Sequence, residues 1–327
     1  MQVRLIAALV AAAMSFVAAP QVGAADYPER PVTFVIPFGP GGASDLFARL
    51  LAASAPKYLS QPVVAVNRAG AAGVVGSTFV VKSEADGYTM LAARVGPQMS
   101  APALNKTIAY KWDEFTFVGL AATSPFVLVV PGDSEFKTFA DFEKKLKAGA
   151  DLSYASVGVG GLLHVASLIM ASEMGVDPAG LIHVPFQGGG KAQTAVISGT
   201  ADFMWQNLSG VRAAIEAGQL RALAITTPER FKALPDIPTV AELGYPNMEA
   251  VVGWDAIYGP PGLPQNVVDT WIEVLNKLGK DEEWLEKMAK LGNIVDIRSP
   301  EETKAFVQKQ YEAFDKTIDK LGMRITK

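Results

Sequence analysis

The residues with the clearest chemical meaning are glycines that stand between a predicted strand and a predicted helix. This pattern occurs at residues 39–45, 157–162 and 187–191, and a weaker glycine cluster covers residues 70–73. Glycine adopts backbone angles that other residues avoid, and without a side chain its N–H group can approach a ligand. The following helix leaves its first N–H groups unpaired at the positive end of its dipole. A single turn of this kind is explained by the frequent use of glycine between strands and helices. The repetition of the pattern favours a site that binds an anionic ligand without Lys or Arg.

Few other side chains offer chemistry. Asp45 and Arg49 are four residues apart on one predicted helix, which indicates a helix cap with an ion pair or a pair that orients the first turn. His164, near a helix start, is expected to pack and hydrogen-bond, and His183 lies inside an apolar strand. Ser156 and His164 are the one nucleophile–base pair that can be proposed, and no Asp is placed to orient the histidine.

Composition excludes several classes of protein. The 327 residues contain no Cys and two His, so a disulfide framework, a Cys-ligated metal, a Cys nucleophile and a three-His metal site are impossible. The net charge of −4 argues against a nucleic-acid partner. Neither a phosphate-binding P-loop, nor a dinucleotide-binding G-x-G-x-x-G after the first strand, nor a G-x-S-x-G elbow is present. We therefore expect no cofactor and no metal.

The glycine turns lie in a chain that alternates strands and helices. Apolar, β-branched segments predict strands at 31–38, 63–66, 88–93, 126–130, 152–156, 181–186, 202–205, 222–226 and 251–258. Helical spacing predicts helices at 45–59, 74–82, 138–147, 162–174, 191–198 and 211–217, and over most of 266–321. This alternation indicates an α/β fold with mainly parallel sheets. Because no flexible linker is visible, a domain boundary should be a crossing strand.

The N-terminus has the pattern of an export signal. Residues 1–25 combine Arg4, an apolar stretch from Leu5 to Ala19, and small residues that suit cleavage after Ala24 or Ala25. The apolar stretch is short for a membrane anchor, and no later run reaches 18 apolar residues. The sequence therefore predicts a periplasmic protein exported by a cleavable signal peptide.

Several segments, in order, carry a family resemblance. They are YPERPVTFVIPFGPGGASDLFARLLA from Tyr27, QPVVAVNRAGAAGVVG from Gln61, ADGYTML from Ala85, LSYASVGVGGLLHVA from Leu152, HVPFQGGG from His183, QLRALAITTPERFKALPDIPTVAELGYP from Gln219, and Trp254 with GPPGLP from Gly259. The chain resembles the substrate-binding proteins of tripartite tricarboxylate transporters, also called the Bordetella uptake gene (Bug) family. The resemblance covers nearly all of the chain after residue 26.

The resemblance implies a fold and a way of binding. The fold is a two-lobed, Venus-flytrap periplasmic binding protein of type II-like topology, with two crossing strands as its hinge. It places residues 26–125 plus 250–327 in one lobe and residues 126–249 in the other. A small carboxylate would lie in the cleft, held by backbone N–H groups and waters. The resemblance carries this role to six residues of the first two turns: Gly41, Gly42, Ala43, Ser156, Gly158 and Gly160.

Departures from the family pattern bear on specificity. Gly161 stands where the family often has Ser or Thr, and Phe186-Gln187 stands where it often has Tyr-Lys, so a hydroxyl, a phenol and a positive charge are missing. Arg94 occupies a loop that faces the cleft in the family, where it would meet a second carboxylate or a phenolate; the alternative is a surface residue. Aromatic residues at strand ends, Phe38, Phe126, Phe186 and Trp205, suggest either an aromatic cleft or core packing.

The expected ligand is thus an aromatic or dicarboxylic acid. The predicted ligand-binding residues are Phe38, Gly41, Gly42, Ala43, Asp45, Arg94, Ser156, Gly158, Gly160, His164, Phe186, Gln187, Gly188 and Trp205. The expected function is a monomeric receptor that delivers the ligand to membrane permease subunits. A ligand sensor for a signalling partner and an enzyme on the same fold are the alternatives.

Overall fold

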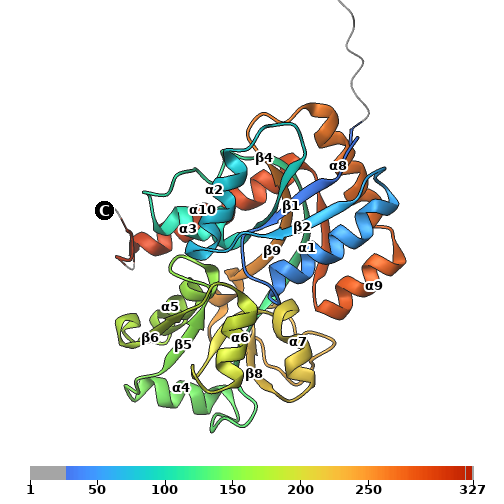
Figure 1. Cartoon of the computed structure of the whole chain (residues 1–327). Helices are drawn as coiled ribbons and strands as arrows, with labels where there is room; N and C mark the ends of the chain where they lie inside the picture. The colour runs from blue at the N-terminus through green and yellow to red at the C-terminus, as the bar shows by residue number, and fades with distance from the viewer. Residues whose placement is uncertain (1–26, 321, 326–327) are drawn as a thin grey trace, which may run out of the picture.

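The computed structural model describes residues 27–320 and 322–325. The predicted signal peptide and its cleavage sites lie outside the described residues. No helix among the described residues is both long enough and apolar enough to span a membrane. Figure 1 shows two lobes, the larger of which contains both the first strands and the last helices of the chain.

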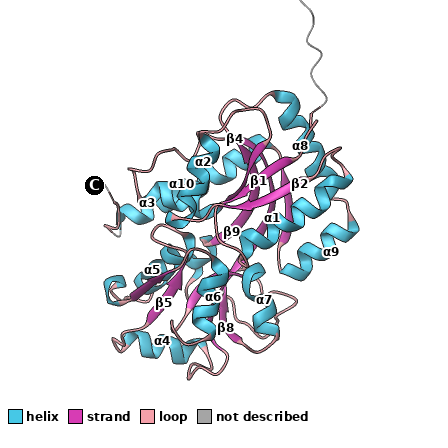
Figure 2. Cartoon of the chain, in the orientation of Figure 1, coloured by secondary structure: helices cyan, strands magenta, loops and turns pink. Residues whose placement is uncertain are grey.

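The larger lobe is a mixed sheet between helices, as Figure 2 shows by element type. Its strands follow the order β10-β4-β9-β3-β1-β2. Strand β1 is parallel to β2 and β3, whereas β9 is antiparallel to β3 and β4. The strands are β1 Val32–Ile36, β2 Val63–Asn67, β3 Thr89–Arg94, β4 Thr116–Pro131, β9 Val252–Gly259 and β10 Ile294–Arg298. The helices and turns are α1 Ala43–Ser54, η1 Ala55–Lys57, η2 Ala71–Gly73, α2 Val74–Val81, the π-helical η3 Gly96–Ser100, α3 Ala101–Leu104, α8 Gln265–Leu278, α9 Glu282–Leu291 and α10 Pro300–Lys320.

Helices hold this sheet through large apolar side chains. The strand sequence VTFVI is apolar and β-branched, and four of its five residues are buried because helices cover both faces. Phe34 of β1 packs edge to face against Trp271 of α8, with ring centroids 5.0 Å apart. Phe47 of α1 meets Trp284 of α9 in the same way at 6.2 Å. These contacts join β1 to α8 and α1 to α9 in the core of the larger lobe.

The smaller lobe has the strands β5 Ser153–Ser156, β6 Ile182–Pro185, β7 Met204–Asn207 and β8 Leu220–Ile225. Its helices and turns are α4 Phe139–Lys147, α5 Leu162–Glu173, η4 Pro178–Gly180, α6 Gly189–Ile197, α7 Leu208–Glu216 and η5 Pro246–Ala250. Strands β5 and β6 are parallel, and β7 and β8 are each antiparallel to β4. Helix α4 begins with a capping box between Thr138 and Asp141.

Strand β4 links the two lobes. From Thr116 to Pro125 it pairs with β9, and from Phe126 onward it pairs with β7 and β8. The second passage between the lobes follows η5 and leads into β9. A short predicted strand at 126–130 is therefore the last part of a 16-residue strand. The length of β4 escaped prediction because Gly119, Ser124 and Pro125 interrupt its apolar pattern.

One further expectation about the elements was wrong, and one predicted boundary is shifted. The sheets are mixed, not mainly parallel, because β4 and β9 run antiparallel to their neighbours where the chain crosses between lobes. The tail is mostly helical, as expected, and β10 lies between α9 and α10 as an edge strand against β4. Helix α6 also begins at Gly189, two residues before its predicted start, because the helical backbone runs into the glycine turn.

Candidate functional site

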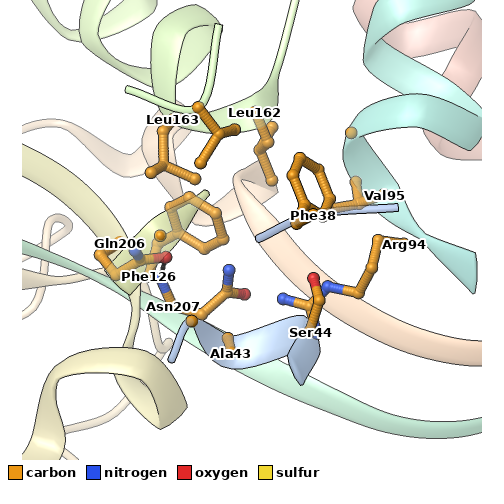
Figure 3. A pocket seen from close by; sticks show the side chains of 14 residues that line it. Phe38, Ala43, Ser44, Arg94, Val95, Phe126, Leu162, Leu163, Gln206 and Asn207 are labelled. Atoms are coloured by element: carbon orange, nitrogen blue, oxygen red, sulfur yellow. Dashed lines mark hydrogen bonds between the residues drawn. The ribbon is translucent and has the colours of Figure 1, made fainter. Parts of the chain in front are cut away.

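A small pocket lies where the two lobes meet. Residues at or beside the N-terminal ends of α1, α5, α6 and α7, within the described chain, line it. The space left between the side chains is about 30 Å³, enough for one or two waters, so the lobes stand close together. Figure 3 shows the pocket. Its lining consists of Phe38, Gly42, Ala43, Ser44, Arg94, Val95, Gly96, Phe126, Val157, Leu162, Leu163, Gly189, Gln206 and Asn207.

Helix α1 presents unpaired N–H groups here. Its N-cap, Gly42, has an extended backbone and no side chain, and its carbonyl accepts from the N–H of Leu46 at 3.0 Å. Because that is the first hydrogen bond of the helix, the N–H groups of Ala43 and Ser44 have no partner within it. Both residues are buried and line the pocket. The positive end of the α1 dipole therefore faces the pocket.

The other helices repeat the arrangement. The first hydrogen bond of α5 joins the Val165 N–H to the Gly161 carbonyl at 3.1 Å, and that of α6 joins the Ala192 N–H to the Gly188 carbonyl at 3.1 Å. Neither helix has a side-chain cap. Asn207, the N-cap of α7, also lines the pocket. Helix ends from both lobes therefore converge on one small space, and their partial positive charges favour an anion there.

Asp45 holds the first turn in shape. Its carboxylate accepts from the Gly41 N–H at 3.0 Å and from the Asn67 amide at 2.9 Å, and it forms an ion pair with Arg49 at 2.9 Å. Burial acts to raise the pKa of Asp45, but the hydrogen bonds from Arg49, Gly41 and Asn67 outweigh it, so the pKa is lowered. Both sequence interpretations of Asp45 and Arg49 therefore describe one network, an ion pair on the helix that also orients the turn.

Glycines let the first and third turns touch across the cleft. The Gly39 N–H donates to the Gln187 carbonyl at 3.0 Å. A Cβ added at Gly42 would lie 3.0 Å from the backbone of Gly189, and one at Gly188 would lie 2.8 Å from the nitrogen of Gly39. The second turn also reaches the larger lobe, because the Ser100 hydroxyl donates to the Gly160 carbonyl at 2.7 Å. The pocket is therefore closed by backbone against backbone.

Arg94 is an interior residue. Its side chain is 3% exposed and forms an ion pair through Nη1 with the carboxylate of Asp255, which is 0% exposed. Its backbone N–H donates to Oε1 of Gln98 at 2.8 Å. Burial raises the pKa of the Asp255 carboxyl, and the Arg94 guanidinium opposes that rise. The alternative of a surface arginine is therefore wrong, and the guanidinium that lines the pocket is already matched by a negative charge.

Two amide side chains at the end of β7 complete the polar lining. Gln206 is 2% exposed and Asn207 is 4% exposed. Oε1 of Gln206 accepts from the Asn207 N–H at 3.0 Å, so the Nε2 donor of the Gln206 side chain points away from that N–H. That Nε2 and Oδ1 of Asn207 have no hydrogen-bond partner among the described residues. An unsatisfied buried donor beside helix ends is a group for which a ligand can supply the partner.

Ser156 meets His183, not His164. Its hydroxyl lies 2.5 Å from Nε2 of His183 and accepts from the Gly158 N–H at 3.0 Å. His164 accepts weakly from the Gly160 N–H at 3.4 Å, and the two imidazoles are 4.6 Å apart beside the ring of Tyr154. Burial and the neighbouring His183 lower the pKa of His164 to about 4, so it is neutral at pH 7. The pair supports the second turn from beneath.

A comparison with protein families decides what kind of protein carries this site. The family model described as "Tripartite tricarboxylate transporter family receptor" matches residues 47–323. The chain belongs to this receptor family. A curated relative, the "UPF0065 protein in tcbD-tcbE intergenic region" of Pseudomonas sp. (strain P51), is 36% identical over 298 residues, which cover 89% of this chain and 86% of the relative.

Solved structures of other receptors share the fold. The periplasmic binding protein BugD is 32% identical, with a TM-score of 0.86 over 91% of this chain and 99% of its own. MatC from Rhodopseudomonas palustris, solved with bound malate, is 29% identical, with a TM-score of 0.85 over 89% of this chain and 100% of its own. The expectation of a two-lobed periplasmic binding protein fold is confirmed.

The structure brings together only part of the predicted ligand-binding set. Phe38, Gly42, Ala43 and Arg94 line the pocket of the receptor. Gly41 and Asp45 belong to the first turn, Ser156, Gly158, Gly160 and His164 form or support the second turn, and Gln187 and Gly188 form the third. These eight residues shape the turns without lining the pocket.

Two predicted aromatic residues lie elsewhere. Trp205 is fully buried, its indole N–H donates to the sulfur of Met170 at 3.2 Å, and it does not line the pocket. Phe186 is half-buried against the core of the smaller lobe. For both residues the alternative of core packing describes the structure. Trp205 lies in β7, where alternate positions face opposite sides, and Phe186 follows the end of β6 at Pro185.

Sequence reasoning missed much of the lining. Leu162, Leu163 and Val157 are apolar and carry no chemical signature. Phe126, one of the aromatic residues at strand ends, lines the pocket but is not among the predicted ligand-binding residues. Gln206 and Asn207 had a usable signal, since two amides between an apolar strand and a helix start, in the segment FMWQNLSG, are unusual for a buried position.

Proposed function

We propose that this receptor captures a small carboxylate between its lobes and delivers it to the membrane subunits of a tripartite tricarboxylate transporter. The observation that carries the proposal is the convergence of the N-terminal ends of α1, α5, α6 and α7 on one pocket. A carboxylate suits this site because it is a compact anion that accepts hydrogen bonds from several N–H groups at once. The malate bound to the related MatC supports the same class of ligand.

The available donors suffice for binding without a free cation. Hydrogen bonds to a charged group contribute about 1.5–3 kcal/mol each. Four such bonds, together with burial of the apolar part of a ligand, can offset the cost of association. A net binding free energy of about −8 kcal/mol then remains, which is a micromolar Kd.

Capture would proceed by closure of the lobes. We place residues 26–125 and 250–327 in one lobe and residues 126–249 in the other. The change of partners along β4 at Phe126 and the start of β9 at Val252 support these boundaries. Because two strands cross between the lobes, small backbone rotations near these positions can open and close the pocket.

The rest of the proposal concerns cellular setting and chemistry. The receptor works in the periplasm as a monomer, after export by a signal peptide in residues 1–25. It leaves its ligand unchanged. Ser156 and His183 form a contact, yet neither histidine bonds to a carboxylate among the described residues, so the orienting group of a hydrolytic triad is missing there.

A ligand screen of the purified chain without residues 1–25 tests the proposal. Small mono-, di- and tricarboxylates are tested for a rise in the melting temperature, and the matching amides serve as uncharged controls. We expect a carboxylate to raise the melting temperature while its amide does not. Mass spectrometry should recover that carboxylate unchanged after incubation. Stabilisation by no carboxylate, or conversion of the ligand to a product, would refute the proposed function.

A further inference from the structure

We infer that Gln206 is a specificity-determining residue, whose side-chain Nε2 donates a hydrogen bond to one oxygen of the bound carboxylate. The inference rests on the proposed function, because it concerns the same site. Gln206 is the third residue of β7 and lines the pocket, beside Asn207 in Figure 3. It is 2% exposed, and its Nε2 has no hydrogen-bond partner among the described residues. A buried donor without a partner is costly, and a ligand that supplies the partner removes this cost.

The orientation of the Gln206 amide is fixed by the backbone. Its Oε1 accepts from the Asn207 N–H at 3.0 Å. Half a turn of the amide would lose this bond and would place Nε2 beside the same N–H, with two donors facing each other. The nearby Oδ1 of Asn207 is also without a partner, but it lies against β9, because an added Cβ at Gly253 would be 1.8 Å from it. Nε2 is therefore held as a donor.

This donor lies where three helices begin. An added Cβ at Gly189, the first residue of α6, would be 2.7 Å from Nε2 of Gln206. An added Cβ at Gly210, in the first turn of α7, would be 3.4 Å from Cδ of Gln206 and 3.2 Å from the nitrogen of Ala43. Ala43 is the first residue of α1. The two glycines leave room for the amide among three positive dipole ends, where an anion is favoured.

A donor in this place distinguishes a carboxylate from a carboxamide. Each carboxylate oxygen only accepts hydrogen bonds, so it can take one from Nε2 of Gln206 and others from the helix ends. The NH₂ group of a carboxamide at the same point would place donors against donors and leave Nε2 without a partner. The helix ends supply the attraction for negative charge, and Gln206 adds a directed hydrogen bond to one oxygen.

Gln206→Glu changes the donor and little else. The new side chain has the same length and keeps an oxygen for the Asn207 N–H, whereas Nε2 becomes an oxygen of an anion. Succinate, adipate and benzoate are titrated by calorimetry at pH 8, because they present the same group on molecules of different shape. The Kd of each acid that binds the unmodified chain should rise about 30-fold or more, because two buried negative charges would face each other. The matched control Gln187→Glu adds the same charge at an exposed side chain and should change the Kd less than about threefold.

Protonation of the introduced carboxyl should restore binding. A protonated carboxyl carries one O–H donor, which replaces the lost Nε2 donor. The ratio of the Kd of Gln206→Glu to the Kd of the unmodified chain should therefore fall about tenfold or more between pH 8 and pH 5. Taking the ratio removes the titration of the ligand and of groups that both proteins share. If Gln206 only supported the fold, this ratio would not change with pH, because either form of the carboxyl accepts from the Asn207 N–H.

Two results would overturn the inference while leaving the proposed function intact. One is an equal Kd for Gln206→Glu and Gln187→Glu at pH 8, and the other is a ratio that stays constant from pH 8 to pH 5. If Gln206→Glu does not fold, Gln206→Met and its control Gln187→Met decide, with a rise in Kd of about tenfold or more expected only for the first. If none of the three acids binds the unmodified chain, the inference is also overturned, and the wider melting screen alone decides the proposed function.

Discussion

Replacing Gly42 by Val should block closure of the pocket without unfolding the protein. Gly42 has φ −96° and ψ 174°, an extended backbone that valine adopts readily. The difficulty lies across the cleft, where an added Cβ would be 3.0 Å from both Cα and N of Gly189 and 3.3 Å from the nitrogen of Gly190. These are backbone atoms at the start of α6, so no change of rotamer can relieve the contact.

The size of the effect follows from this overlap. Atoms added to a closely packed contact cost about 1–3 kcal/mol. The cost falls on the closed state alone, because in an open state the turns that carry Gly42 and Gly189 are separated. At 1.4 kcal/mol for each factor of ten, the ligand Kd should rise about 5- to 150-fold. The ligand-free protein should lose only the small contribution of a glycine N-cap, about 1 kcal/mol or less.

The measurement combines titration calorimetry with small-angle X-ray scattering. A carboxylate found in the melting screen is titrated into the unmodified chain and into Gly42→Val, and the radius of gyration is measured at saturation. Gly180→Val is the matched control, because an added Cβ there meets nothing within 4 Å. A Kd for Gly42→Val within twofold of the control, with equal compaction, would refute the role of the glycine contact in closure.

Three other predictions concern the groups around the pocket. Arg94→Met leaves the Asp255 carboxylate buried without its partner, so urea denaturation should show a loss of about 3–5 kcal/mol in the free energy of unfolding. The double variant Arg94→Met/Asp255→Leu should recover most of this loss, and equal stability of the single and double variants would contradict the prediction. Burial and His183 lower the pKa of His164 to about 4, so the unfolded chain binds a proton at this residue first as the pH falls. The free energy of unfolding should therefore decline between about pH 6.5 and pH 4, and it should decline less in His164→Asn. Equal urea midpoints of the two proteins across this range would count against the prediction. Asp45→Asn removes the charge that holds the first turn, so ligand affinity should fall by about tenfold while the melting temperature of the ligand-free protein changes by a few degrees; unchanged affinity in titration would show that the turn holds its shape without it.

The sequence predicted the local elements well. The first strand, the helix after the first turn and the helix capped by Thr138 follow from apolar spacing and capping residues, which act over a few positions. It predicted less well where elements depend on distant partners. Strand β4 begins at Thr116, before the predicted start at residue 126, because β9 pairs with it from Thr116 to Pro125, and β10 exists because it adds to the edge of the same sheet. A single segment of sequence contains no record of such partners.

The same division applies to the site. The glycine turns indicated the helix N-termini that can bind an anion, because a glycine before a helix leaves the backbone N–H groups of the helix end open to a ligand. The sequence predicts Arg94 as a ligand-binding residue, but its partner Asp255 is 161 positions away, so the sequence does not show that the charge of Arg94 is balanced. Trp205 is an aromatic candidate whose direction depends on which face of β7 meets the core.

By itself, then, the sequence determined the kind of ligand group that this receptor can hold. Glycine turns before helices supply backbone donors for an anion wherever the chain places them, because the unpaired N–H groups belong to each helix end. The tertiary structure decided which helix ends meet, that Arg94 is matched by Asp255, and that Gln206 faces the pocket while leucines of α5 cover its other side. These features set the lining of the pocket, and they arise only from packing between residues that are far apart in the chain.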